Sequence, residues 1–88
     1  MLDLFPGLRS LRAFDAAARH VSFTTAAAEM NVTPAAISHQ IRELEDQIGA
    51  TLFTRTSRSM ALTREGDILL AASAEAIGSL STALQRIH

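Results

Sequence analysis

The sequence has no cysteine, no tryptophan and no tyrosine, and its 88 residues include only two prolines and four glycines. Without cysteine, a disulfide framework, a zinc finger and a redox motif are excluded. The four phenylalanines leave little surface on which single-stranded nucleic acid could stack. No run approaches the roughly 18 apolar residues of a membrane helix, and the start MLDLFPGLRS is too short and too acidic for a secretory signal. We therefore expect a soluble, cytoplasmic chain that contacts no membrane.

Positive and negative charges are nearly balanced, because the chain has eight Lys or Arg residues and nine Asp or Glu residues, for a formal net charge of −1. This balance argues against a nucleic-acid partner, since phosphate binding usually leaves a basic footprint. The charges are, however, unevenly distributed along the sequence. No acid lies between Asn31 and Arg42 or between Asp46 and Glu65. The acids Glu43, Glu45 and Asp46 crowd the stretch between these segments, and we expect that stretch to point away from phosphate.

Alanine and leucine dominate the chain and favour helix nearly everywhere. A Pro-Gly turn precedes an amphipathic first helix, predicted from Leu8 to about residue 19. Ser22 is a suitable N-cap for a short second helix over about 23–30. Thr33 followed by proline predicts the start of a third helix over about 34–48, because threonine caps free N–H groups and proline is pre-set for the first helical position.

The third predicted helix has one narrow apolar stripe, which must be buried against the first two helices. Its members are Ile37, Ile41, Leu44 and Ile48. The opposite side is therefore free and polar. Two helices joined by a short turn, the second with a free polar side, form the helix-turn-helix arrangement that enters a major groove. On pattern alone, an ordinary three-helix bundle remains the alternative.

The residue pattern changes over about 51–63. Two short runs that favour β-strand flank a polar turn there, and they predict a small hairpin, or wing. Thr63 can cap a last helix over about 64–87, which at roughly 1.5 Å per residue is about 36 Å long. That helix has an apolar seam at heptad spacing, with alanines beside it. The seam residues are Leu70, Ser73, Ile77, Leu80, Leu84 and Ile87. The helix could fold back on its own bundle, but a seam facing solvent would aggregate, so we expect a partner helix.

The motifs A-x-S-x-x-I-x-x-L-E, L-F-x-R and L-T-x-x-G occur linked in the stretch LRAFDAAARHVSFTTAAAEMNVTPAAISHQIRELEDQIGATLFTRTSRSMALTREG. This combination resembles the N-terminal winged helix-turn-helix of LysR-type transcriptional regulators, and AAARHVSF and AISHQIRELE resemble the glycine-cleavage-activator branch. The resemblance implies a mainly α bacterial DNA-binding domain over 1–63 and a linker helix over 64–88 that forms a homodimer, with a tetramer left open for the full-length protein. We expect the dimer to associate with the nucleoid and to bind double-stranded DNA at a site whose sequence is an interrupted inverted repeat.

Full-length family members continue into a larger effector domain, which is absent from these 88 residues. The chain ends at His88, where the linker helix is expected to end. It is therefore either an excised domain or a natural protein without the sensor, and excision is the better interpretation.

The predicted DNA-contacting side of the third helix lies between about 40° and 140° around the helix axis, measured from Pro34, whereas the apolar stripe lies near 280° to 340°. We call the four residues in this arc the reading face: Ala35, Ser38, His39 and Arg42. Their methyl, hydroxyl, imidazole and guanidinium groups suit base edges or phosphates. The resemblance also places Thr33 and Pro34 toward DNA, although Pro34 replaces a glutamine common there.

Simpler roles exist for three of these residues. Thr33 can serve mainly as a helix cap, with its N–H neighbours meeting a phosphate. Ser38 can bond back to a helical carbonyl, and His39 can be merely solvated.

The predicted wing has arginines suited to phosphate oxygens or to a narrow minor groove. The resemblance assigns backbone or minor-groove contacts to Arg55 and Arg58, and we expect Ser57, which lies between them, to contact DNA as well. Solvated turn arginines are the alternative, and Arg55 has a further one, a salt bridge to Glu43 or Glu45.

Catalysis is poorly supported, because the three histidines are scattered without metal-ligand spacing and no Gly-rich phosphate loop is present. We expect no catalytic residue, no metal and no cofactor. A second hypothesis is a protein-interaction module whose long helix pairs with a partner and whose helix-turn-helix is vestigial.

Overall fold

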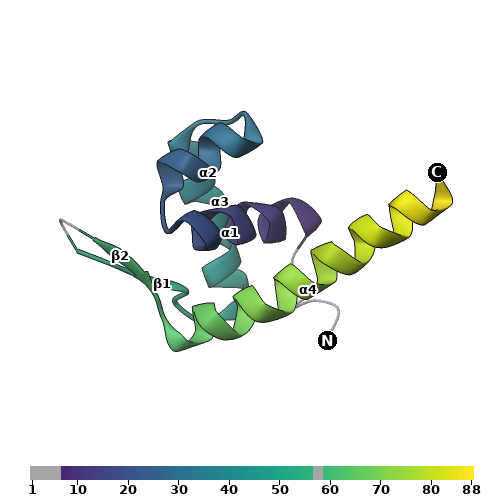
Figure 1. Ribbon diagram of the computed structural model, residues 1–88. Coiled ribbons are helices and arrows are strands. Elements are labelled where there is room, and N and C mark those ends of the chain that lie inside the picture. Colours follow the sequence, from purple (N-terminus) through teal and green to yellow (C-terminus); the bar gives the residue numbers. More distant parts are fainter. Residues whose placement is uncertain (1–6, 57–58) are drawn as a thin grey trace.

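The computed structural model describes residues 7–56 and 59–88, which form a three-helix bundle, a hairpin and a long last helix (Figure 1). In chain order the elements are α1 (Leu8–His20), α2 (Phe23–Met30), α3 (Pro34–Ile48), β1 (Phe53–Arg55), β2 (Met60–Leu62) and α4 (Arg64–Ile87). The predicted mainly α, winged helix-turn-helix fold is confirmed. Ser57 and Arg58, both predicted to contact DNA, lie outside the described residues.

Three of the helices begin at a hydroxyl side chain that accepts a hydrogen bond from the first turn. The pairs are Ser22 Oγ with Thr25 N at 3.1 Å, Thr33 Oγ1 with Ala36 N at 3.1 Å, and Thr63 Oγ1 with Gly66 N at 3.0 Å. Each bond satisfies an amide that has no partner within its helix. The predicted starts of α2, α3 and α4 are therefore confirmed. The predicted end of α3 near residue 48 is also confirmed, and the next residue, Gly49, has a left-handed φ of 80°.

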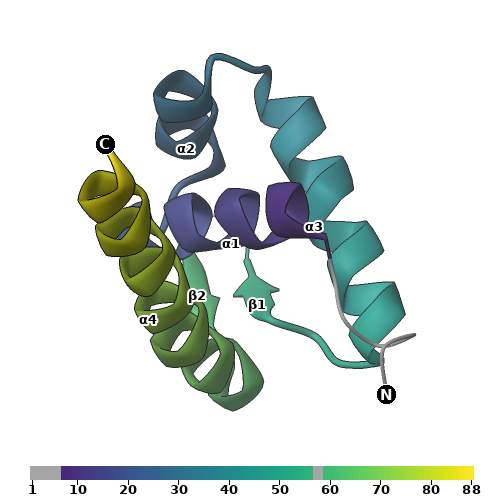
Figure 2. The ribbon, with the colours of Figure 1, turned by 90° about the vertical axis from the view of Figure 1, so that its right-hand side faces the viewer.

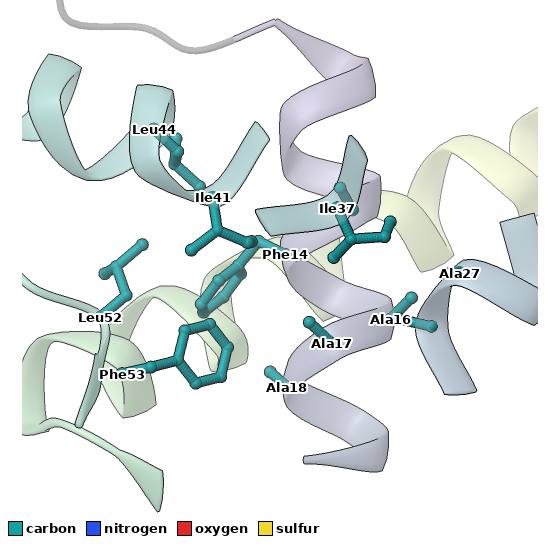
Figure 3. Close-up of a cluster of buried hydrophobic side chains, with 12 residues drawn as sticks. Phe14, Ala16, Ala17, Ala18, Ala27, Ile37, Ile41, Leu44, Leu52 and Phe53 are labelled. Atoms are coloured by element: carbon teal, nitrogen blue, oxygen red, sulfur yellow. The ribbon is translucent and has the colours of Figure 1, made fainter. Parts of the chain in front are cut away.

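The core forms around α1, which crosses the centre of the bundle and packs against α2, α3 and α4 (Figure 2). Small alanine side chains on α1 and α2 allow this close approach. The largest fully buried side chains are Phe14, Ile37, Ile41, Leu44 and Leu52 (Figure 3). Burying each contributes roughly 1.5–3 kcal/mol to folding.

One predicted member of the α3 stripe lies outside this core. Ile48 is 37% exposed. The buried stripe ends one turn earlier, at Leu44, because Ile48 is the last residue of α3 and the chain turns away at Gly49.

The wing is anchored to the core at its base. The rings of Phe53, at the start of β1, and Phe14 have centroids 5.7 Å apart. Antiparallel pairing places Phe53 opposite Leu62. Beside this pair, Thr63 Oγ1 donates to the Thr51 carbonyl at 2.6 Å. These contacts fix where the hairpin leaves the bundle.

The long helix α4 has two different environments along its length. Its first half packs against α1, where Ser73 is only 3% exposed and Leu70 packs on the core. Its second half extends away from the bundle (Figure 1), where Leu80, Leu84 and Ile87 are exposed. The alternative considered above, in which the last helix folds back on its own bundle, is therefore correct for the first half of α4 only.

By length and composition alone, α4 could also cross a membrane. An 18-residue stretch of this helix has a mean hydropathy of 1.3, and only 6% of that stretch is buried inside the domain. The sequence did not predict this, because polar residues interrupt every apolar run. Two features favour a helix of the folded domain instead. Ser73 is packed inside the domain, and Glu75 would place a charge in the middle of a membrane span.

Candidate nucleic-acid interface

The reading face of α3 is accessible along the side opposite the core. Ala35, His39 and Arg42 are exposed, and Ser38 is half-buried. Thr33 and Pro34 are exposed at the N-terminus of the same helix, where unsatisfied amides carry partial positive charge. The structure thus groups all six predicted α3 contacts at one end and one side of this helix. The Thr33 hydroxyl caps the helix, which was the simpler of the two roles considered for this residue.

An acid borders the reading face. His39 Nε2 and Glu43 Oε1 are 2.5 Å apart, one helical turn from each other. Glu43 thus contacts a residue of the reading face, and whether the acids of α3 point away from phosphate stays a prediction. The spacing of four residues was the available signal, because side chains at i and i+4 are neighbours on a helix surface.

Arg55 on β1 is exposed, and its guanidinium carbon lies 4.6 Å from the centroid of the Phe23 ring. This is a cation–π contact, which holds the side chain while its N–H donors stay accessible. The salt bridge to Glu43 or Glu45 considered above is wrong. Glu45 instead accepts backbone hydrogen bonds from Leu52 N at 2.8 Å and from Phe53 N at 3.4 Å.

A shallow hollow of about 350 Å³ lies between the start of α2 and the part of the wing where β1 ends and β2 begins. Arg55 and Thr56 line it from the wing side. Ser22 and Phe23 line it from the N-terminus of α2. A guanidinium therefore lies beside a helix N-terminus, and both favour negative charge.

An ion-pair network joins α1 to α2. Arg19 bonds Asp15 at 2.8 Å and Glu29 at 2.5 Å, and His20 Nε2 lies 2.8 Å from the second Glu29 oxygen. The bond from Arg19, followed by that from His20, lowers the pKa of Glu29 from 4.5 to about 2. The same bonds raise the pKa of Arg19. Sequence reasoning missed the network, because it depends on how α1 crosses α2.

The predicted seam of α4 is divided by the fold. Ser73 is buried within the domain, and Leu70 and Ile77 are half-buried. The exposed fractions of Leu80, Leu84 and Ile87 are 51%, 58% and 77%. Leu80 and Leu84 also line a hollow of about 320 Å³ with Leu8 of α1. The second half of α4 and the edge of α1 therefore offer exposed apolar surface to a partner.

Within residues 7–56 and 59–88, no group of His, Asp and Glu residues is arranged to hold a metal ion. What the surface offers is a helix with a free polar side, a neighbouring hairpin with an arginine and a bundle that holds both. These features define a winged helix-turn-helix DNA-binding domain.

Comparison with known families agrees with that class. The profile described as "Bacterial regulatory helix-turn-helix protein, lysR family" matches residues 8–67. This chain belongs to the LysR family of bacterial regulators.

Two curated relatives are transcriptional activators. The chain is 50% identical over its 88 residues to the glycine cleavage system transcriptional activator of Escherichia coli (strain K12), and it covers 29% of that protein. It is 47% identical over 81 residues to the HTH-type transcriptional activator AmpR of Pseudomonas aeruginosa, covering 92% of this chain and 27% of the relative. The chain thus spans less than a third of the length of either relative.

Solved structures show the same fold bound to DNA. The BenM DNA-binding domain in complex with catB site 1 DNA superposes with a TM-score of 0.87 at 30% identity, covering 92% of this chain and 91% of that one. The CbnR DNA-binding domain–DNA complex superposes with a TM-score of 0.82 at 26% identity, covering 91% and 92%.

Proposed function

We propose that this domain binds an interrupted inverted repeat in double-stranded DNA as a homodimer and regulates bacterial transcription from the nucleoid, in the cytoplasm. Each α3 enters a major groove, and each wing lies over the adjacent backbone or minor groove. The observation that carries the proposal is the accessible reading face on the side of α3 opposite the core. No catalytic step is part of it, and the two curated relatives named above are transcriptional activators.

The reading face supplies several kinds of base contact. Ala35 can touch a thymine methyl, and Ser38 can bond a base edge or a phosphate. Arg42 has the fork of donors that suits guanine O6 and N7. His39 donates to guanine or to the backbone, and Glu43 beside it limits which ring nitrogen is free.

The wing supplies contacts to the phosphate backbone that do not depend on base sequence. The Arg55 guanidinium and the start of α2 face one hollow, which suits a phosphate oxygen. Ser57 and Arg58, which lie between β1 and β2 in the sequence, extend these contacts to the backbone or minor groove. Each phosphate neutralised in this way makes binding weaker at higher salt.

The second half of α4 is the proposed dimer contact. Leu80, Leu84 and Ile87 form an apolar edge with no covering element among the described residues. A second copy of the helix covers this edge and sets the spacing between the two reading faces. In a full-length protein of the relatives' length, an effector domain follows α4, and a tetramer is compatible with this arrangement.

The test is selection of bound sites from random duplex DNA, followed by measurement of the mass of the complex. We expect an inverted repeat and two chains per duplex. Replacing both Arg55 and Arg58 by alanine should make the plot of log binding constant against log salt concentration less steep, by about 0.9 for each phosphate that is no longer neutralised. A wild-type chain without sequence preference, or a slope that the double variant leaves unchanged, would contradict the proposal and favour a protein-interaction module.

A further inference from the structure

Another concave surface lies between α1 and α3, at the turn that joins α2 to α3. It is a hollow of about 560 Å³, within the size range of pockets that hold ligands. We call it the α1–α3 groove. Its apolar lining consists of Leu8, Ala13, Met30, Val32, Ala36 and Ile37. Leu8 is 53% and Val32 44% exposed, so the groove has accessible apolar edges as well as an apolar floor.

Two arginines of α1, Arg9 and Arg12, line the same groove. Arg9 and Arg12 form no ion pair with any residue in the described part of the chain. The acids nearest along α1 and α2 are already engaged, since Asp15 and Glu29 both bond Arg19. Among the residues that the structure describes, the groove therefore combines an apolar floor with two guanidinium groups that have no acidic partner.

The α1–α3 groove does not overlap the reading face. Its α3 members, Ala36, Ile37 and Gln40, lie at about 200° to 300° around the helix, measured from Pro34, whereas the reading face spans about 40° to 140°. DNA held against the reading face therefore leaves the groove open. Phosphate alone would satisfy the arginines but would leave the apolar floor uncovered.

We propose that the α1–α3 groove is a docking site for an acidic peptide segment of another protein, one that presents leucine-like side chains between carboxylates. The apolar side chains fill the floor between Leu8 and Val32. The carboxylates pair with Arg9 and Arg12, because guanidinium groups bond carboxylates in a planar, two-pronged geometry. Given the DNA binding proposed above, such a partner contacts the domain while the domain occupies its operator.

The probe is a capped 12-residue peptide with three Asp-Asp-Leu-Leu repeats, titrated into the isotope-labelled 88-residue chain and followed by NMR. We expect amide shifts at Leu8, Ala13, Val32 and Ala36. Two control peptides replace every Asp by Lys or every Leu by Ser, and each should bind at least tenfold more weakly. Equal binding of either control peptide, or no shifts at these amides, overturns the proposal.

Charge and apolar variants locate the contact. Arg9→Glu and Arg12→Glu should each weaken peptide binding at least tenfold, whereas Arg86→Glu on α4 makes the same charge change and should leave it unaltered. Leu8→Ser should weaken binding, and Ile68→Ser, which is an exposed residue of α4, should not. The NMR spectrum of each variant verifies that it is folded. Variants at the groove that bind like the wild type overturn the proposal.

Two further measurements separate this proposal from its competitors. Peptide and selected duplex DNA should bind together, so competition between them would assign the arginines to the DNA surface and overturn the proposal. Peptide binding that occurs only after residues 1–6 are removed would assign the groove to the chain's own start and overturn it as well. A chain that binds the peptide but no DNA would disprove the proposed function and leave the docking site in place.

Discussion

Gly66, in the first turn of α4, lies directly against the backbone carbonyl of Leu52. A Cβ atom added at Gly66 would be 2.3 Å from the Leu52 oxygen and 2.8 Å from Leu62 Cδ2. The same carbonyl accepts a hydrogen bond from Thr63 N at 3.0 Å. The glycine of the L-T-x-x-G motif is thus a packing requirement, because the start of α4 must approach the chain that leads into the wing.

Replacing Gly66 by alanine should lower the free energy of unfolding by about 1–3 kcal/mol, since backbone must move to admit the methyl group. Gly78→Ala is the matched control in the same helix, where an added Cβ meets nothing within 4 Å. That variant should stabilise the chain by about 0.5–1 kcal/mol. Urea unfolding measures both, and equal effects of the two substitutions would refute the packing argument.

Glu45 connects the end of α3 to the base of the wing through the amides of Leu52 and Phe53. Glu45→Ala should lower the free energy of unfolding by about 1–3 kcal/mol, because it leaves buried donors without an acceptor. Glu45→Gln keeps one acceptor oxygen and should cost less. Hydrogen exchange of the Leu52 amide should accelerate in the alanine variant. Glu43→Ala is the control, and an equal destabilisation there would contradict the role of Glu45.

Stability should depend on Glu29 in a particular pH range. Its pKa is lowered in the folded chain from 4.5 to about 2, so its ion pairs stabilise the fold above the unfolded value and lose that effect as pH falls toward 2. The Tm difference between wild type and Glu29→Gln should therefore be largest above about pH 5 and shrink below it. Thermal unfolding monitored by circular dichroism checks this. Glu75→Gln, on α4, should give no comparable trend.

Arg55 and Phe23 allow charge and packing at the wing to be separated. Arg55→Ala should reduce the log–log salt slope of DNA binding by about 0.9 if the guanidinium contacts one phosphate. Phe23→Leu retains the charge but removes the ring beneath it, so affinity should fall while the slope stays unchanged. Titrations at several salt concentrations measure both quantities. An unchanged slope in Arg55→Ala would place this arginine away from phosphate.

Leu84 tests the proposed dimer contact. Leu84→Asp places a charge on the exposed apolar edge of α4 and should convert a dimer into a monomer, as measured by sedimentation equilibrium. Thr82→Asp introduces the same charge about 160° around the helix and should leave the dimer intact. A wild-type chain that is already monomeric at micromolar concentration, or a dimer that survives Leu84→Asp, would exclude this edge as the contact.

Local sequence determined where the helices begin and which side of each is apolar. Ser22, Thr33 and Thr63 cap helices through amides only three residues away, and helical spacing sets the stripe from Ile37 to Leu44. The linked motifs were specific enough to indicate the family on their own. These features depend on neighbours within a turn or two, so they are visible in the sequence itself.

Only the tertiary structure decided which partners distant residues share. Glu45 could have paired with Arg55, but the fold places backbone amides beside Glu45 and the Phe23 ring beside Arg55. The seam of α4 is continuous in sequence, yet the fold buries Ser73 and leaves Leu84 exposed. In each case the outcome depends on the crossing of elements far apart along the chain, and periodicity within one element contains no information about that crossing.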